Sequence, residues 1–181
     1  FDPKRMKPAS HYGMWARNKK FDLKAISDKK KIERKYSKKI NKNVVFYKNF
    51  EKMIIEQKPK IVSISTWKDT HYMITKRCIE MGLKVIILEK PLANNIKEAK
   101  KLINIINKKK AKVLVNHRRR YDDDIISLKN KLKTGIIGDI IQVSSFYVYG
   151  LLTTGTHLID TLRMLLSEIY GDVETVVGFE N

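Results

Sequence analysis

Short apolar runs alternate with longer amphipathic stretches along residues 21–116. Each run is rich in Val, Ile or Leu and ends at a polar residue or a turn, which predicts a strand. The predicted strands span residues 21–27, 44–47, 61–66, 85–88 and 113–115. Helical spacing of apolar residues predicts helices at 29–40, 49–58, 69–81 and from 95 onward. Strands that alternate with helices predict an α/β fold with a Rossmann-like, doubly wound parallel sheet.

The pattern changes after Asn116, and we expect a second domain there. A helix is predicted over 123–133, followed by a glycine-containing turn and a long alternating run at 140–149. Such alternation predicts a mostly antiparallel sheet with one covered face. Another strand-like run spans 173–179. We therefore divide the chain into a dinucleotide-binding type of domain, residues 1–117, and the start of a second domain, residues 118–181.

Both ends of the sequence look cut. The chain begins at Phe1 with a polar segment and stops inside the strand-like run 173–179. A dinucleotide-binding fold carries G-x-G-x-x-G on its first strand-to-helix turn, and this motif is absent from the sequence. Either the first strand has been lost or the fold never bound a dinucleotide. If the strand has been lost, we expect the fragment to be inactive.

Charge and composition narrow the range of partners. The formal net charge is +19, but the lysines are spread over nearly every predicted helix, and the lysine runs at 29–31, 38–39, 100–101 and 108–110 contain no aromatic residues. We therefore expect no specific binding to nucleic acid. No apolar stretch is long enough to span a membrane and no signal peptide is visible, so a cytoplasmic protein is expected. The single cysteine, Cys78, is predicted to be a buried helical thiol, and we predict no metal site.

Glu89-Lys90-Pro91 follows the apolar run 85–88 and is a candidate active-site turn. Ligands of open α/β sheets bind outside the carboxyl ends of the strands. A lysine at this position can exchange protons with a bound substrate, and the proline makes a cis peptide bond available. A polar loop in a basic protein is the alternative interpretation of the same tripeptide.

Five short motifs occur in one order and spacing. They are Ser65-Thr66 followed by His71, Glu89-Lys90-Pro91-Leu92-Ala93, residues 115–122 (VNHRRRYD), residues 135–140 (GIIGDI), and residues 155–160 (GTHLID). Together they resemble the glucose-fructose oxidoreductase, inositol dehydrogenase and MocA family of NAD(P)-dependent oxidoreductases. The resemblance runs from about His11 to the end. It implies a Rossmann domain followed by an α/β domain that usually builds a homo-oligomer, a dimer or a tetramer.

The resemblance also implies a set of cofactor-binding residues. They are Asp28, Ser65, Thr66, Trp67, His71, Glu89, Lys90 and Pro91. Asp28 would bind the adenosine ribose, which favours NAD over NADP, although a helix-capping role explains it equally well. Thr66, Trp67 and His71 would line the nicotinamide half of the cleft. A solvated histidine in the first turn of a helix is the alternative for His71, and many relatives carry proline in place of Trp67.

Lys90, His157 and Asp160 are the catalytic candidates that the resemblance implies. The lysine would hold the reacting oxygen, and the histidine would exchange the proton while hydride moves to or from nicotinamide. An ordinary histidine pKa, roughly 6.5, suits this task. Asp160 has three alternative roles: it orients His157, contacts the substrate, or satisfies the helix terminus.

One position departs from the family pattern. Many members have aspartate four residues before the histidine, where this chain has Thr153, so a paired Asp/His mechanism is not expected. Predicted substrate-binding residues are Asn116, Arg119, Arg120 and Tyr149. For the arginines, simple exposure on a basic surface competes with this role.

Three functions follow from the sequence. The first is a fragment of an oxidoreductase that acts on a hydroxyl or carbonyl of a sugar, cyclitol or sugar-acid-like small molecule. The second is a non-catalytic Rossmann-like module that binds a ligand or regulates a partner, which Thr153 and the missing glycine motif motivate. The third is electrostatic binding to nucleic acid, which would depend steeply on salt.

Overall fold

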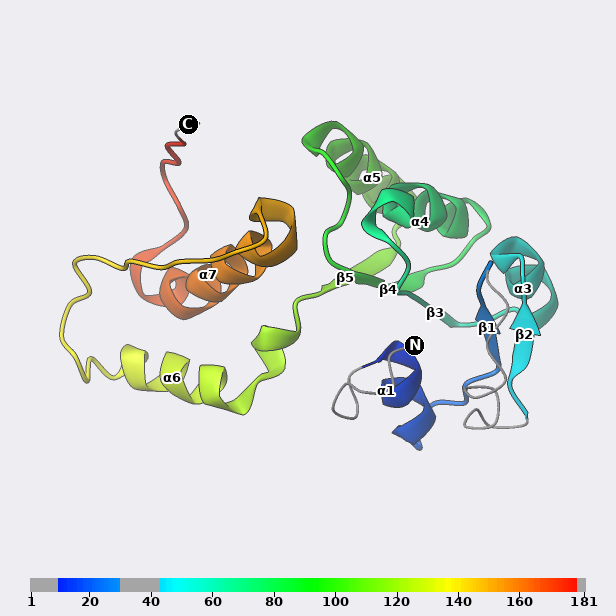
Figure 1. The fold of residues 1–181 in the computed structure, drawn as a ribbon, viewed down its shortest axis with the longest axis horizontal. Coiled ribbons are helices and arrows are strands. Elements are labelled where there is room, and N and C mark those ends of the chain that lie inside the picture. The colour runs from blue at the N-terminus through cyan, green and yellow to red at the C-terminus, as the bar shows by residue number, and fades with distance from the viewer. Residues whose placement is uncertain (1–9, 30–42, 179–181) are drawn as a thin grey trace.

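Parallel strands form two small sheets in the computed structural model, which describes residues 10–29 and 43–178 (Figure 1). Strand β1 (Ala25–Ser27) pairs with β2 (Val45–Tyr47). Strands β3 (Ile61–Ile64), β4 (Val85–Glu89) and β5 (Lys112–Asn116) pair in the order β3-β4-β5. The predicted parallel α/β architecture is therefore confirmed. The helix predicted at 29–40 falls almost wholly outside the described residues.

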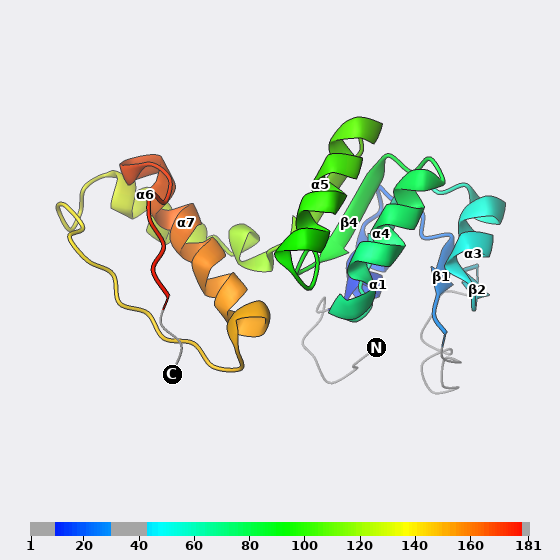
Figure 2. The ribbon, with the colours of Figure 1, turned by 90° about the horizontal axis from the view of Figure 1, so that it is seen from above.

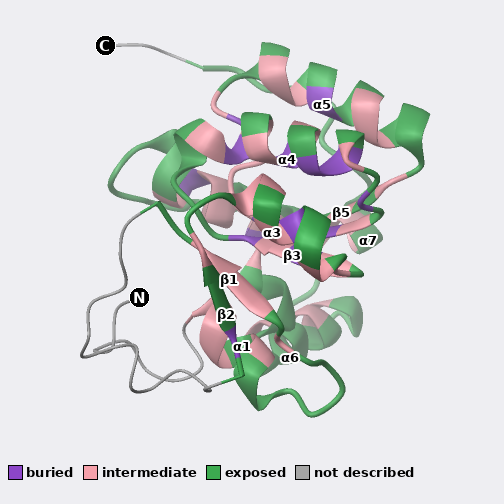
Figure 3. Ribbon diagram, turned by 90° about the vertical axis from the view of Figure 1, so that its right-hand side faces the viewer, coloured by how far each residue is buried: buried purple, intermediate pink, exposed green. Residues whose placement is uncertain are grey.

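Helices cover both faces of the three-stranded sheet. Helices α4 (His71–Glu80) and α5 (Ile96–Lys109) lie on one face, and the short α1 (His11–Arg17) lies on the other (Figures 1 and 3). Helix α3 (Phe50–Gln57) packs beside β1 and β2. Each strand is joined to the next helix by only a few residues. Consecutive elements therefore lie next to each other, and the helices pack on the sheet.

The predicted helix caps are present. Asn49 Oδ1 accepts a hydrogen bond from the Lys52 amide at 2.9 Å, and Asn95 Oδ1 accepts one from the Glu98 amide at 2.9 Å. After α4 the chain reaches Gly82 with φ +93°, a conformation that glycine adopts without strain. Because each cap depends on residues close in sequence, the pattern was sufficient to predict it.

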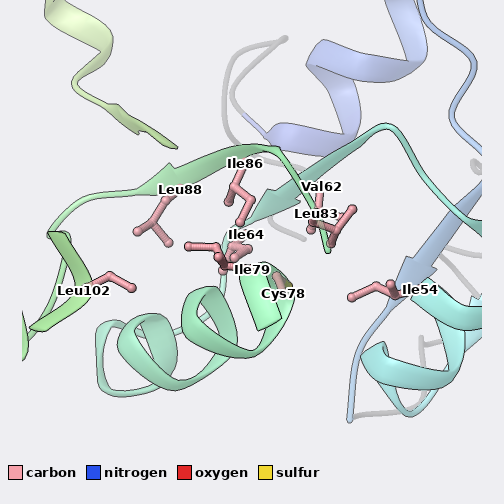
Figure 4. Packing of buried hydrophobic residues seen from close by; sticks show 9 residues of the cluster. All are labelled: Ile54, Val62, Ile64, Cys78, Ile79, Leu83, Ile86, Leu88 and Leu102. Atoms are coloured by element: carbon pink, nitrogen blue, oxygen red, sulfur yellow. The ribbon is translucent and has the colours of Figure 1, made fainter. Parts of the chain in front are cut away.

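The hydrophobic core lies between β4 and the helices α4 and α5 (Figure 4). Ile86 and Leu88 are two residues apart on β4, so they point to the same face of the sheet, and both are fully buried. Leu102 of α5 packs in the same cluster. Burying each such side chain contributes about 1.5–3 kcal/mol. Cys78 of α4 is buried here as predicted, and burial raises its thiol pKa to about 12. This core fixes the position of the turn that follows β4.

Two helices and a loop follow the sheet. A 3₁₀ turn, η2 (Arg118–Tyr121), leads into α6 (Asp123–Lys133). A π-helical turn, η3 (Leu151–Gly155), continues directly into α7 (Thr156–Tyr170). Helices α6 and α7 pack together (Figure 2). Lys129 and Lys133 of α6 both form ion pairs with Glu168 of α7. The pair of helices thus lies beside the sheet as a second unit of packing.

The prediction of strands at 140–149 and 173–179 is wrong for the described residues. Residues 140–149 and 173–178 have no regular secondary structure, and their side chains are mostly exposed. A strand needs a neighbour to accept and donate its backbone hydrogen bonds, and the described residues offer these runs none. Alternation alone therefore did not produce a sheet.

None of the helices in the described part of the chain combines the length and apolar character that crossing a bilayer requires.

Candidate active site

The carboxyl ends of β3, β4 and β5 lie along one edge of the sheet and position the candidate site. Glu89, the last residue of β4, stands in register with Asn116, the last residue of β5. The Lys90-Pro91 bond that follows is cis, as the sequence allowed. The strand ends thus bring the Glu-Lys-Pro turn next to Asn116, as expected for a parallel sheet.

Glu89 is bound from two sides inside the protein. His11 Nε2, at the start of α1, lies 2.8 Å from Glu89 Oε1, and Asn116 Nδ2 donates to the same oxygen at 2.7 Å. The other ring nitrogen of His11 contacts the Ser63 hydroxyl of β3. Burial alone would raise the pKa of Glu89, but the hydrogen bonds from His11 and Asn116 outweigh it and hold the pKa at about 2.

This network gives Glu89 and Asn116 a structural role. Through its Oε1 atom the Glu89 carboxylate joins α1 to the ends of β4 and β5. Both residues hold the base of the turn that carries Lys90. Their predicted roles in binding cofactor and substrate stay predictions.

His71 is a buried link between two turns. Its side chain is 1% exposed, so the alternative of a solvated histidine is wrong, while its role in cofactor binding stays a prediction. Nδ1 lies 2.7 Å from the Pro91 carbonyl oxygen, and Nε2 lies 3.0 Å from the Thr66 carbonyl oxygen. His71 therefore ties the turn after β4 to the turn after β3.

The other predicted cofactor residues lie at exposed positions on the same edge or on β1. Ser65, Thr66 and Trp67 follow β3, and Trp67 is 84% exposed. The Thr66 hydroxyl accepts a hydrogen bond from Thr70 at 2.7 Å. Asp28 is exposed directly after β1, and its amide donates to the Tyr47 carbonyl at 3.0 Å. Their cofactor roles stay predictions.

Lys90 reaches across to the π-helical turn before α7. Its Nζ donates to the Thr153 carbonyl oxygen at 2.6 Å. Thr153 is the residue that replaces the aspartate of many relatives, so its side chain brings no carboxylate to this contact, which uses the backbone carbonyl. The contact brings the turn after β4 and the start of α7 together, although they are 63 positions apart in the sequence.

His157, in the first turn of α7, faces His117, and their rings meet edge to face at 5.7 Å between centroids. Burial lowers the pKa of His157, and the positive charges of Lys90, Arg119, His117 and Arg118 lower it further. Its Nδ1 is buried and has no hydrogen-bond partner in the described part of the chain. A histidine held neutral in this way can accept a proton at neutral pH.

Asp160 binds Arg120 rather than His157. Arg120 Nε lies 3.0 and 2.9 Å from the two carboxylate oxygens, and Nη2 lies 2.8 Å from Oδ1. The nearest histidine contact is His117 Nδ1, 3.7 Å from Oδ2. Asp160 therefore does not orient His157, and the Arg120 guanidinium is committed to joining η2 with α7.

Arg119 and Tyr149 keep their predicted substrate roles without support from contacts. Arg119 is exposed on η2 and forms no ion pair within residues 10–29 and 43–178. Tyr149 is 83% exposed, with φ +66°, in the irregular segment before η3. The structure thus brings Lys90 to Thr153, four residues before His157.

Sequence reasoning missed two histidines of the site. His11 lies at the start of a short helix, and its partner Glu89 is 78 positions away, so no local pattern joins them. His117 directly follows the end of β5, and this strand-end position is a signal that would have found it.

Comparison with known proteins decides which family this geometry belongs to. The sequence profile of the Gfo/Idh/MocA group, described as an oxidoreductase family with an NAD-binding Rossmann fold, matches residues 6–117. The chain belongs to this oxidoreductase family. The resemblance to this family is therefore confirmed, and the motifs up to residue 117 and the parallel sheet lie within the matched residues.

Individual relatives agree with the family assignment. The uncharacterised oxidoreductase YhhX of Escherichia coli is 27% identical over 110 residues, which cover 61% of this chain and 32% of that protein. Inositol 2-dehydrogenase/D-chiro-inositol 3-dehydrogenase of Lacticaseibacillus casei is 36% identical over 103 residues, covering 50% and 30%. The chain thus spans about a third of the length of these two curated relatives.

A solved structure shows the same fold. The crystal structure of an oxidoreductase from Bacillus cereus superposes with a TM-score of 0.70 at 22% identity. The superposition covers 86% of this chain and 47% of that one. It therefore extends beyond the residues that the family profile matches.

Proposed function

We propose that this family member transfers hydride between a nicotinamide cofactor and a hydroxyl or carbonyl group of a sugar, cyclitol or sugar-acid-like molecule. The observation that carries the proposal is the hydrogen bond from Lys90 to Thr153, which brings the turn after β4 to the segment that carries His157. Lys90 contacts the turn before α7, and its charge acts on the His157 ring. An inositol dehydrogenase among the relatives supports a polyol-like substrate.

The residues at the sheet edge fit a nicotinamide cofactor. Asp28, exposed at the end of β1, suits the ribose hydroxyls, and the exposed Thr66 and Trp67 at the end of β3 suit the nicotinamide end. When bound, the oxidised cofactor would supply a hydride acceptor. An acidic Asp28 favours NAD over NADP. NADP is the alternative, because one relative is named scyllo-inositol 2-dehydrogenase (NADP(+)) IolW of Bacillus subtilis.

Lys90 and His157 divide the proton chemistry. During oxidation the substrate C–H bond breaks and its electron pair leaves with the hydrogen, while the O–H proton passes to His157. A neutral His157 suits this step because its pKa is lowered. The Lys90 ammonium donates to the same substrate oxygen and stabilises the charge that develops there. Lys90 has three N–H donors, so it can keep its bond to the Thr153 carbonyl.

Replacing Lys90 tests the proposal. We expect Lys90→Met, made in the intact protein, to lower the rate of hydride transfer about 100-fold or more, because the developing oxygen charge loses its donor. Lys84→Met is the matched control, because Lys84 Nζ also donates to a backbone carbonyl, that of Lys109 at 2.7 Å. Lys84 directly precedes β4, so it lies at the opposite end of that strand from Lys90. Reduced-nicotinamide absorbance with a panel of polyols and sugar acids measures the rate.

The same experiment addresses the alternative of a non-catalytic ligand-binding module. Thr153 favours this alternative, because it supplies no carboxylate beside the histidine. Equal hydride transfer in the Lys90→Met and wild-type proteins would overturn the catalytic role of Lys90. Ligand binding without any hydride transfer in the intact wild-type protein would favour the module instead. Under either function, we propose that residues from 118 onward form a second domain that contacts other copies of the chain in a dimer or tetramer.

A further inference from the structure

The charge of Lys90 has no counter-ion at the site. Lys90 is half-buried, and its ammonium donates to the Thr153 carbonyl at 2.6 Å, which is a neutral acceptor. No carboxylate lies within ion-pair distance of Lys90 in the described part of the chain. A partly buried ammonium that lacks a carboxylate is costly, since desolvation is only partly offset by a carbonyl.

The carboxylates that could neutralise Lys90 are committed elsewhere. Glu89, its neighbour in sequence, accepts hydrogen bonds from His11 and Asn116. Asp160, on the same helix as His157, is held by Arg120 through three contacts of 2.8–3.0 Å. The site therefore keeps an excess of positive charge that its own residues do not remove.

Further positive charge gathers around His157. Arg118 and Arg119 stand on η2 beside His117, and neither forms an ion pair with a described residue. Their charges act on His157 in the same sense as that of Lys90. By contrast, Arg120 in the same turn is neutralised by Asp160. Thus Lys90, Arg118 and Arg119 add positive charge around His157, and no carboxylate among the described residues forms an ion pair with any of the three.

We infer that the substrate of this site is an anion, a hydroxy acid of the sugar-acid type whose carboxylate meets Lys90 and Arg119. The inference rests on the proposed function, which it narrows from polyols in general to polyol carboxylates. A carboxylate would form charge-assisted hydrogen bonds with the ammonium and guanidinium groups, which are about twice as strong as neutral ones. A neutral cyclitol would leave the Lys90 charge uncompensated.

Binding to the isolated chain, without cofactor, tests the inference independently of hydride transfer. The probes are D-gluconate and D-glucitol, which share a carbon chain and differ in one carboxylate. The readout is the ring C–H signals of His11, His71, His117 and His157 in NMR spectra, assigned with His→Gln variants. We expect gluconate to shift the His117 and His157 signals saturably and to raise the pKa of His157, because the bound anion offsets the surrounding positive charge. Glucitol at equal concentration is expected to leave them unchanged.

Variants locate the bound carboxylate. We expect Lys90→Met and Arg119→Gln each to weaken gluconate binding about ten-fold or more, as for loss of one partner of a hydrogen-bonded charge pair. Lys84→Met should bind gluconate as the wild type does, and unchanged His71 signals report that each variant is folded.

Four results would overturn the inference. The first is an equal response to glucitol and gluconate, and the second is a response to acetate equal to that to gluconate, which would show an adventitious ion only. The third is gluconate binding that survives in Lys90→Met, and the fourth is no saturable response to either gluconate or glucitol. Since none involves cofactor or turnover, failure here leaves the proposed hydride transfer standing for a neutral substrate.

Discussion

Glu89 illustrates how one residue joins the stability of the fold to the position of the site. Its pKa is held at about 2 by His11 and Asn116, against 4.5 for an ordinary glutamate. A lowered pKa means that the folded state favours the carboxylate. The resulting stability is fully present above about pH 4.5 and is lost as the pH falls toward 2.

We predict that Glu89→Gln lowers the free energy of unfolding at pH 7 by about 1–3 kcal/mol, since hydrogen bonds to a charged acceptor are replaced by weaker ones. The variant should also lose less stability than the wild type between pH 4.5 and 2. Urea denaturation at a series of pH values measures both effects. Glu168→Gln is the control, because Glu168 also has a pKa of about 2, set by Lys129 and Lys133, but lies on the surface where solvent screens its charge. An equal pH response in the two variants would contradict the role given to the buried network.

His71 and Thr75 offer opposite predictions one helical turn apart on α4. Each ring nitrogen of His71 lies within hydrogen-bond distance of a carbonyl oxygen, and the N–H of the neutral ring donates to one of them, so we expect His71→Leu to lower the free energy of unfolding by about 1–3 kcal/mol. Thr75 is fully buried and its hydroxyl has no partner within the described residues. Thr75→Val, which keeps the shape and removes the unpaired hydroxyl, should be neutral or stabilising. Thermal and urea unfolding of the two variants compare them, and a destabilised Thr75→Val protein would mean that its hydroxyl is bonded in solution.

At the scale of elements, the Arg120–Asp160 pair joins η2 to α7. The Asp160 side chain is 15% exposed, and the guanidinium approaches it through two nitrogens. Arg163 and Asp172 form a similar pair at the end of α7, but their side chains are 51% and 68% exposed. Charge pairs shielded from water are coupled more strongly than exposed ones.

We therefore predict a coupling energy of about 1–3 kcal/mol for Arg120→Gln with Asp160→Asn in a double-mutant cycle. The same cycle for Arg163→Gln with Asp172→Asn should give less than about 1 kcal/mol. Urea denaturation of the single and double variants supplies both values. Equal coupling in the two cycles would show that the first pair does not dock α7.

The elements that the sequence predicted well depend on neighbours in sequence. Asn49 and Asn95 cap their helices through amides three residues away, and the alternating burial along β4 follows from its own apolar residues. The site depends on longer separations: Lys90 and Thr153 are 63 positions apart, and Arg120 and Asp160 are 40. Motif resemblance placed Lys90 and His157 together, but it did not show which carboxylates were already bound.

The run at 140–149 failed as a strand prediction for a related reason. Alternation shows which side chains would face a core, but a strand forms only where another strand supplies hydrogen bonds. In the described residues that partner is absent, and Ile141 and Phe146 are left 98% and 96% exposed. At the scale of the whole molecule, exposed apolar side chains therefore occur on a chain with a net charge of +19.

The exposed apolar side chains favour self-association and the net positive charge opposes it, and the salt concentration changes the balance because it screens the charge. At 0.1 M salt, charge repulsion acts over about 10 Å and should keep copies of the chain apart, whereas at 1 M it acts over about 3 Å. We predict that self-association rises with salt and that sedimentation velocity detects it. Ile141→Lys with Phe146→Lys should abolish the rise, while Ile96→Lys, at the start of α5 where Ile96 is 72% exposed, should not.

Retention on DNA should change in the opposite direction, falling steeply with salt and showing no sequence preference. A single species at both salt concentrations would show that the exposed run is not adhesive, and DNA binding that persists at high salt would revive the nucleic-acid hypothesis.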